Sequence, residues 1–176
     1  RDRSPSRGLG DVYKRQELMT ENGLLTEQGS STFWDRSTLY ALRGIYIAGQ
    51  ADRATEFLSH YARRRLLGDH VPYPIEAWPE GSQRHLAAES GLFCRVITEG
   101  LFGIRPTGFR SFDLTPSMPS GWNRMALRHI RAFENNFDLV IEKQPDGFLR
   151  VTLAISGRNP RAFRLRQGAS LRIKLP

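Results

Sequence analysis

The sequence has few of the features that identify a protein's chemistry directly. It contains one cysteine, Cys94, so no disulfide can form within the chain and the redox state of its compartment is left open. No apolar run approaches the roughly 20 residues that a membrane-spanning helix needs. The four histidines lack metal-ligand spacing, and there is no glycine-rich loop for a phosphate or a dinucleotide. We therefore expect no membrane association, no metal and no cofactor.

The charge of the chain is basic but weakly patterned. Its net charge is +8, from 26 Lys and Arg against 18 Asp and Glu; residues 1–16 hold five of the basic and two of the acidic side chains, so +5 remains elsewhere. Much of that excess follows Arg158, at a spacing that suits the exposed faces of strands. This favours a solvated charged surface over a nucleic-acid site, with a polyanionic partner as the alternative.

The first residues look foreign to the rest of the chain. Residues 6–16, SRGLGDVYKRQ, form a basic stretch around a glycine-rich turn, which would suit a nucleic-acid-binding arm or a terminus without function. The same string resembles the translated adapter of transposon-based sequencing libraries. We therefore treat residues 1–16 as adapter-derived, not native, and expect them not to pack against the rest. An adapter also implies a gene fragment whose true N-terminus is missing.

The chain then divides into a helical and a β-rich part. Apolar residues recur at helical spacing over residues 32–49, with Thr32 as the N-cap, over 52–68, with Asp52 as the cap, and roughly over 84–103. Short β-prone runs follow: SFDLTPSMP, MALRHIRAF, FDLVIEKQ, FLRVTLAI and SLRIKL. Asp146-Gly147 predicts a hairpin turn between two of them. This pattern indicates a helical domain followed by an antiparallel β-sandwich.

One carboxylate breaks the apolar face of the third expected helix. Glu89 falls among the apolar residues of that face, one turn from Leu86 and from Phe93. A carboxylate there must be paired, hydrogen-bonded or open to a cavity. Glu89 is accordingly either a structural acid that supports the preceding loop or pairs with an arginine, or an acid that lines a pocket.

The long loop before that helix mixes acids with aromatic residues. Glu76 and Glu80 flank Trp78 in the run YPIEAWPEGSQRH, which ends in Arg84 and His85. Loops of about 15 residues without structure of their own tend to be functional. Carbohydrate sites need this mixture, because aromatic faces stack on sugar rings, acids and arginines bond hydroxyl groups, and a pair of acids performs hydrolysis. Paired glutamates are also common on ordinary surface loops.

A longer stretch resembles a known family. The run YPIEAWPEGSQRHLAAESGLFCRVITEGLFGIRPTGFRSFDLTPSMPSGW is similar to the C-terminal part of six-hairpin, or (α/α)6-barrel, glycosidases. The phrases that carry the likeness are EGLFGI with Pro106, and LTPSMP with Trp122. The stretch WDRSTLYALRGIYIAG…DRATEFLSHYARR resembles a hairpin that places an Arg/Asp pair at the mouth of the sugar pocket. Together the resemblance covers about residues 33–140.

The resemblance implies a fold and a domain division. The expected fold class is an α+β fragment: residues 17–104 as the last helices of an (α/α)6 catalytic barrel, and residues 105–176 as a C-terminal β-sandwich. Because most neighbours of those helices would be missing, we expect their apolar faces to be unusually exposed.

The resemblance also implies a function. It suggests a glycosidase acting on an oligo- or polysaccharide, inverting, with Glu76 or Glu80 as general base and the general acid upstream of this chain, so that this chain alone is inactive. The implied substrate-binding residues are Trp34, Asp35, Arg36, Trp78, Arg84, His85 and Glu89. For the first three, capping and packing is the alternative role.

Two other functions stay open. A glycoside phosphorylase of similar fold would use phosphate in place of water, and a non-catalytic carbohydrate-binding or structural module would present its aromatic residues as an open platform. The expected partner is a carbohydrate, neither nucleic acid nor a membrane; a periplasmic or extracellular location is favoured over the cytoplasm. The sugar, the linkage and the oligomeric state are not specified by the sequence.

Overall fold

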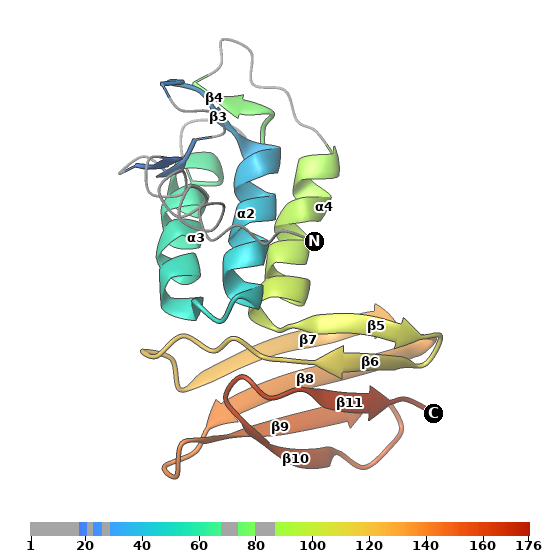
Figure 1. Ribbon diagram of the computed structural model, residues 1–176. Helices are drawn as coiled ribbons and strands as arrows, with labels where there is room; N and C mark the ends of the chain where they lie inside the picture. The colour runs from blue at the N-terminus through green and yellow to red at the C-terminus, as the bar shows by residue number, and fades with distance from the viewer. Residues whose placement is uncertain (1–17, 21–22, 26–28, 68–73, 80–86) are drawn as a thin grey trace, which may run out of the picture. The chain divides into compact units, whose positions relative to one another are not determined.

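The chain forms two compact units. The computed structural model describes residues 18–20, 23–25, 29–67, 74–79 and 87–176 (Figure 1). The helical unit contains the described residues up to Leu42 together with Glu56–Val96, and the strand unit contains Arg43–Thr55 and Ile97–Pro176. Residues 1–16, predicted not to pack, lie outside the described residues. No helix in the described ranges is long and apolar enough to cross a membrane.

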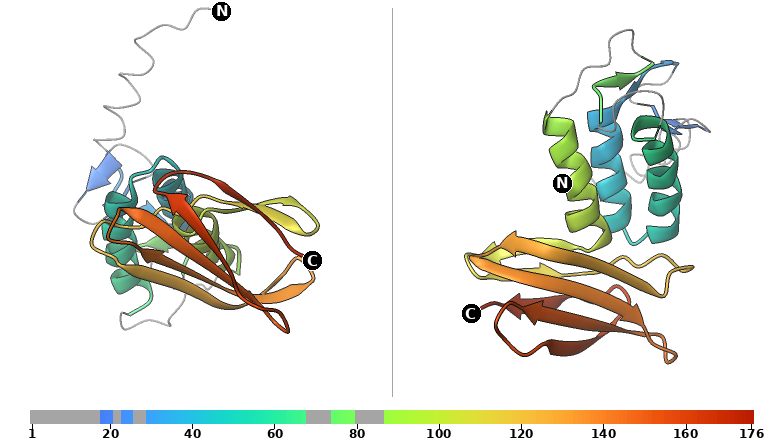
Figure 2. Two further views of the ribbon diagram at one scale, coloured as in Figure 1. Left: turned by 90° about the horizontal axis from the view of Figure 1, so that it is seen from below. Right: turned by 180° about the vertical axis from the view of Figure 1, so that it is seen from behind.

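Three helices are present, close to the predicted positions. They are α2 (Asp35–Ile47), α3 (Ala51–Arg65) and α4 (Ala87–Arg95), and α4 continues into a wider π-helical segment, η1 (Val96–Leu101). Gly49, with φ +78°, follows the end of α2 as predicted, because the left-handed backbone there favours glycine. In the helical unit α2 lies between α3 and α4 (Figures 1 and 2).

The predicted start of the first helix is wrong. Thr32 does not cap it; the helix begins at Asp35, and the two residues before it form strand β3 (Phe33–Trp34). This strand pairs antiparallel with β4 (Ala77–Trp78), which lies in the stretch expected to be a loop without structure. A second short pair, β1 (Met19–Thr20) with β2 (Gly23–Leu24), also belongs to the helical unit.

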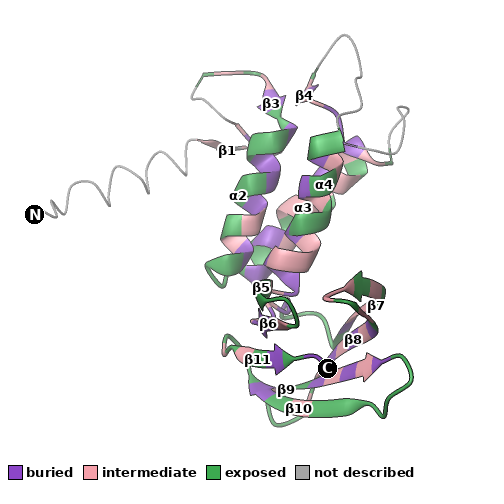
Figure 3. Cartoon of the chain, turned by 90° about the vertical axis from the view of Figure 1, so that its right-hand side faces the viewer, coloured by how far each residue is buried: buried purple, intermediate pink, exposed green. Residues whose placement is uncertain are grey.

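The strand unit is built from two antiparallel sheets. One has the order β10-β9-β8-β7 and the other β11-β6-β5. The strands are β5 (Ile104–Gly108), β6 (Ser111–Leu114), β7 (Arg124–Ala132), β8 (Asn135–Lys143), β9 (Phe148–Ile155), β10 (Arg161–Arg166) and β11 (Leu171–Lys174). Buried residues alternate with more exposed ones along β8 and β9, as Figure 3 shows. The inward rings of Phe112 and Phe137, one from each sheet, lie 5.9 Å apart between centroids, so the sheets pack face to face.

The hairpin prediction is confirmed, but two strands of these two sheets are missing from the predicted runs. β8 pairs antiparallel with β9 around the Asp146-Gly147 turn, where Gly147 has φ +79°. The predicted runs omit β5 and β10. Each is the edge strand of its sheet and is exposed along most of its length, so neither carries the apolar alternation that identifies a strand.

Polar contacts join Arg43–Thr55, which includes the end of α2 and the start of α3, to the rest of the strand unit. Ser117 Oγ donates to the Tyr46 carbonyl at 2.9 Å, and the Ser120 N–H donates to Asp52 Oδ1 at 2.6 Å. Asp52 is therefore not the predicted N-cap: α3 begins one residue earlier, at Ala51, and the Asp52 side chain accepts a distant backbone N–H instead.

The predicted fold class is wrong. The described residues hold three short helices, of 13, 15 and 9 residues, against eleven strands, and these helices are not the last helices of an (α/α)6 barrel. The apolar faces of α2 and α3 include fully buried residues, since Leu39, Leu42 and Ala54 are each no more than 1% exposed, whereas Phe57 on α3 and Phe93 on α4 are half-buried. Helical periodicity identifies which face of a helix is buried, but not how many helices share the core.

Gly103 provides a test of the strand unit. It has φ +65°, and a Cβ placed there would overlap the carbonyl of Thr115, whose N–H donates to the Gly103 carbonyl at 3.0 Å. Gly103→Ala should destabilise the protein by more than the about 1–2 kcal/mol that a left-handed backbone costs a residue with a Cβ. Urea unfolding measures the loss. Gly147→Ala is the matched control, because Gly147 has φ +79° but open space around it; equal losses for both would contradict the contact.

Asp113 predicts a dependence of stability on pH. Arg172 holds the pKa of this carboxyl below its ordinary 3.8, with Arg105 adding to the effect. The ion pair therefore stabilises the fold above about pH 4, and that contribution is lost as the pH falls through the lowered pKa. Asp113→Asn should lower the melting temperature at neutral pH, and the gap to wild type should close below pH 4. A gap that stays constant down to pH 2 would contradict this.

Candidate functional site

A buried carboxylate organises the end of the helical unit where α2 begins. Asp35 is fully buried and accepts three hydrogen bonds: from Arg65 Nε at 2.8 Å, from the Tyr61 hydroxyl at 3.0 Å and from the Ile75 N–H at 3.2 Å. Arg65 is itself 3% exposed. One side chain of α2 is thus tied to α3 and to the segment that leads into β4.

Burial and neighbouring charges shift the pKa values of two groups in this cluster. Burial raises the pKa of Asp35, and the charge of Arg65 works against that rise. Burial, together with the charge of Asp35, raises the pKa of Tyr61 far above its ordinary value. The Tyr61 hydroxyl therefore remains protonated and available as a donor to the carboxylate.

The backbone next to Asp35 positions Glu76. The Asp35 N–H donates to the Glu76 carbonyl at 3.0 Å, and the β3–β4 ladder pairs Phe33 with Trp78 and Trp34 with Ala77. Glu76 is half-buried, and Trp34 is 44% exposed. Two tryptophans therefore come from one small backbone ladder, and Glu76 is the residue directly before its second strand.

The ring of Trp78 lies among cationic and aromatic groups. The guanidinium of Arg64 lies 4.8 Å and that of Arg65 5.1 Å from its ring centroid, and the Phe33 ring is 5.6 Å away. Cation–π attraction and ring packing hold the indole in one place. Trp78 is half-buried.

Glu89 has the partner that its position required. Its Oε1 accepts a hydrogen bond from Arg36 Nε at 2.8 Å, and its side chain is 1% exposed while that of Arg36 is 58% exposed. The other oxygen, Oε2, is buried and has no hydrogen-bond partner among the residues that the structure describes. Glu89 is thus a paired acid with one acceptor oxygen unused.

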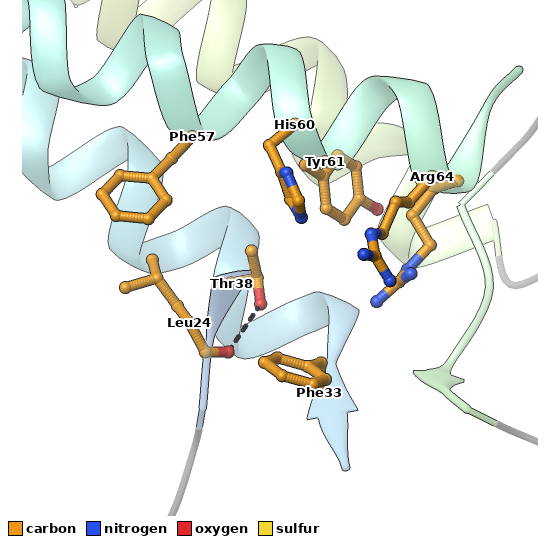
Figure 4. Close-up of a pocket in the computed structure, with 8 residues that line it drawn as sticks. Leu24, Phe33, Thr38, Phe57, His60, Tyr61 and Arg64 are labelled. Carbon is orange, nitrogen blue, oxygen red and sulfur yellow. Dashed lines mark hydrogen bonds between the residues drawn. The ribbon is translucent and has the colours of Figure 1, made fainter. Parts of the chain in front are cut away.

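A small cavity lies beside this cluster (Figure 4). Its volume is about 10 Å³, room for a single water molecule. His60 points into it from α3, and neither His60 Nε2 nor Arg65 Nη1, both buried, has a hydrogen-bond partner within the described ranges. The lining residues are Leu24, Phe33, Thr38, Phe57, His60, Tyr61, Arg64 and Arg65. The cavity is too small for a sugar ring, so it is not itself a saccharide site.

The structure brings together part of the predicted site. Trp34 and Trp78 share the β3–β4 ladder, Glu76 directly precedes it in the chain, and Arg36 with Glu89 forms an ion pair between α2 and α4. The side chain of Asp35 is taken up entirely by internal partners. Glu80, Arg84 and His85 lie outside the described residues.

Two members of the cluster are absent from the sequence-based set. Tyr61 and Arg65 are four residues apart on α3, a spacing that places both on one face of the helix. The signal was available in the sequence, but Arg65 belongs to an Arg63-Arg64-Arg65 run that looks like ordinary basic charge at the C-terminal end of a helix.

Known proteins offer no guide to this site. Comparison with protein families, with curated proteins and with solved structures finds no match to this chain. Within the part of the chain that the structure describes, no group of three His, Cys, Asp or Glu side chains is placed to hold a metal ion.

Glu89 predicts a measurable stability cost. Glu89→Gln keeps the shape of the side chain but removes the charge opposite Arg36 and places an amide in a buried position. We expect a loss of about 1–3 kcal/mol in the free energy of unfolding. Chemical denaturation measures it. Glu142→Gln is the control, because its ion pair with Arg124, at 3.5 Å, is exposed and worth less than about 1 kcal/mol. Equal costs would show that Glu89 is not a buried, paired charge.

Proposed function

We propose that the complete protein to which this chain belongs hydrolyses a glycosidic bond in an oligo- or polysaccharide, with Glu76 as the base that activates water. The observation that carries the proposal is that Glu76, a half-buried carboxylate, directly precedes the strand β4 of the β3–β4 ladder, which contains Trp34 and Trp78. The resemblance of residues 33–140 to glycosidase sequences supports the same function, although not the barrel fold that it implied.

The proposed binding surface uses the exposed side of this ladder. The Trp34 indole offers an aromatic face to the apolar face of a sugar ring. The Arg36 guanidinium, more than half exposed, offers donors to hydroxyl groups while Glu89 fixes its orientation. This combination of a ring, a fork of N–H donors and a carboxylate is the chemistry that recognises a neutral saccharide.

In the proposed reaction, Glu76 removes a proton from a water molecule as that water attacks the anomeric carbon. The bond from that carbon to the leaving oxygen breaks, and an acid supplied upstream of this chain protonates the leaving oxygen. Direct attack by water inverts the anomeric configuration. Glu80 is the alternative base, with the other glutamate binding a hydroxyl group, and Glu89 supports the site through Arg36.

A non-catalytic carbohydrate-binding module is the second candidate. One observation favours it: Trp34 is exposed on a surface ladder, as an open stacking platform requires. A module would bind saccharides through Trp34 without turning them over, and its affinity would not depend on the charge of Glu76.

The test compares Glu76→Gln with wild type in the product of the complete gene, assayed on a panel of oligosaccharides. The amide keeps the shape of the side chain but cannot accept the proton, so kcat should fall about 10²–10⁴-fold while the melting temperature stays unchanged. Glu80→Gln and Glu89→Gln, made in parallel, assign the roles of the other two acids.

The outcomes separate the two candidate functions. Loss of turnover in Glu76→Gln or Glu80→Gln with intact folding supports hydrolysis. Binding that is abolished by Trp34→Ala, with no turnover in wild type, supports the module. Loss of turnover only in Glu89→Gln, with the protein fully folded, would make the helix acid the catalyst and contradict the assignment of Glu76.

A further inference from the structure

Asp35 binds two backbone groups near Glu76, one in the Pro74–Ile75 peptide unit and one in the Glu76–Ala77 unit. Its Oδ2 accepts the N–H of Ile75, the residue before Glu76, at 3.2 Å, and its own N–H donates to the Glu76 carbonyl at 3.0 Å. These two bonds run in opposite directions between the same pair of segments. They therefore fix both the distance and the rotation of the Glu76 backbone relative to the start of α2.

Arg65 connects this clamp to Trp78. Its Nε donates to Asp35 Oδ1 at 2.8 Å, and its guanidinium lies 5.1 Å from the Trp78 ring centroid. One planar group thus contacts the carboxylate and the indole at once. A shift of Asp35 would move the guanidinium, and with it the ring two residues after Glu76.

The position of the Asp35–Arg65 ion pair indicates a role beyond stabilising the fold. Replacing a buried ion pair by apolar groups of similar volume is often neutral or stabilising, so such pairs are weak evidence of a stability role. This cluster leaves Arg65 Nη1 without a hydrogen-bond partner among the described residues, an arrangement that stability alone does not favour. It is nevertheless bonded directly to the segment that carries Glu76 and Trp78.

We propose that Asp35 and Arg65 are positioning residues, which set the orientation of Glu76 and Trp78 for the ligand without touching it. The proposal rests on the proposed function for its catalytic consequence and on the clamp geometry for its structural one. It also gives Asp35 a different role from the sugar contact that the sequence suggested.

The structural half of the proposal is tested on this chain by fluorescence. In a Trp34→Phe, Trp122→Phe background all tryptophan emission comes from Trp78, since the sequence has three tryptophans. Asp35→Asn should shift its emission to longer wavelength at a temperature where circular dichroism still reports folded helices. Tyr61→Phe, which removes one donor but keeps the ring stacked on Phe93 at 6.2 Å, should give a smaller shift in the same direction. Unchanged emission in both variants overturns the clamp.

The catalytic half is tested in the product of the complete gene. Asp35→Asn should lower kcat by about 10²-fold, as expected for a misplaced catalytic group, while KM changes little because the variant leaves the exposed ring and arginine in place. Arg65→Lys keeps the charge but loses the planar contact with Trp78, so its kcat should lie between the values for wild type and Asp35→Asn. If Asp35→Asn does not fold, kcat is measured in Tyr61→Phe instead, because this variant removes one hydrogen-bond donor to Asp35.

A matched control separates positioning from stability. Asp113→Asn removes a carboxylate that also pairs with an arginine, at 2.7 Å, but in the strand unit. It should lower the melting temperature without lowering kcat at temperatures where the protein is folded. An equal loss of kcat in this control overturns the positioning role, as does unchanged kcat in Asp35→Asn of an active enzyme. If the wild-type protein shows no turnover, the proposed function is contradicted instead. The fluorescence experiment then still tests whether Asp35 and Arg65 position Trp78.

Discussion

The helical unit depends on the buried carboxylate of Asp35, which requires hydrogen-bond donors around it. Asp35 is removed from water, so its carboxylate needs strong donors, and it finds them on α3 and in the segment before β4. The arrangement of α2, α3 and the β3–β4 ladder follows from that requirement. Removing one partner of such a pair typically costs about 3–5 kcal/mol, since the other partner is left buried and uncompensated. The chemistry proposed for Glu76 and Trp78 takes its geometry from the same bonds.

The strand unit is held together differently. Its two sheets pack through apolar side chains that alternate with exposed ones, and Phe112 stacks on Phe137 and on Phe133 where the sheets meet. Its ion pair between the nearly buried Asp113 and the exposed Arg172 makes stability depend on pH. The arginines of β10 are likewise exposed, which agrees with a solvated face.

Local patterns in the sequence identify the features that neighbouring residues determine. Helical spacing places α2 and α3, Gly49 marks the end of one helix, and Asp146-Gly147 marks a hairpin. Contacts between distant residues are not specified by such patterns. Glu89 shows that a partner is needed, but Arg36 lies 53 residues away; Asp35 looks like part of a helix start, but its side chain binds Arg65, 30 residues on. The barrel prediction fails for the same reason, because short motifs do not specify the surroundings of the helices.

The central claim is that the Asp35 carboxylate fixes the segment that carries Glu76. Native-state hydrogen exchange of the wild-type chain, followed at the Ile75 and Asp35 amides, tests it most directly. Both amides are hydrogen-bonded within the clamp, so both should exchange only with the global unfolding of the helical unit, as slowly as the central amides of α2. Fast exchange at Ile75 alongside slow exchange in α2 would show that the segment opens independently of the helices, and would contradict the account.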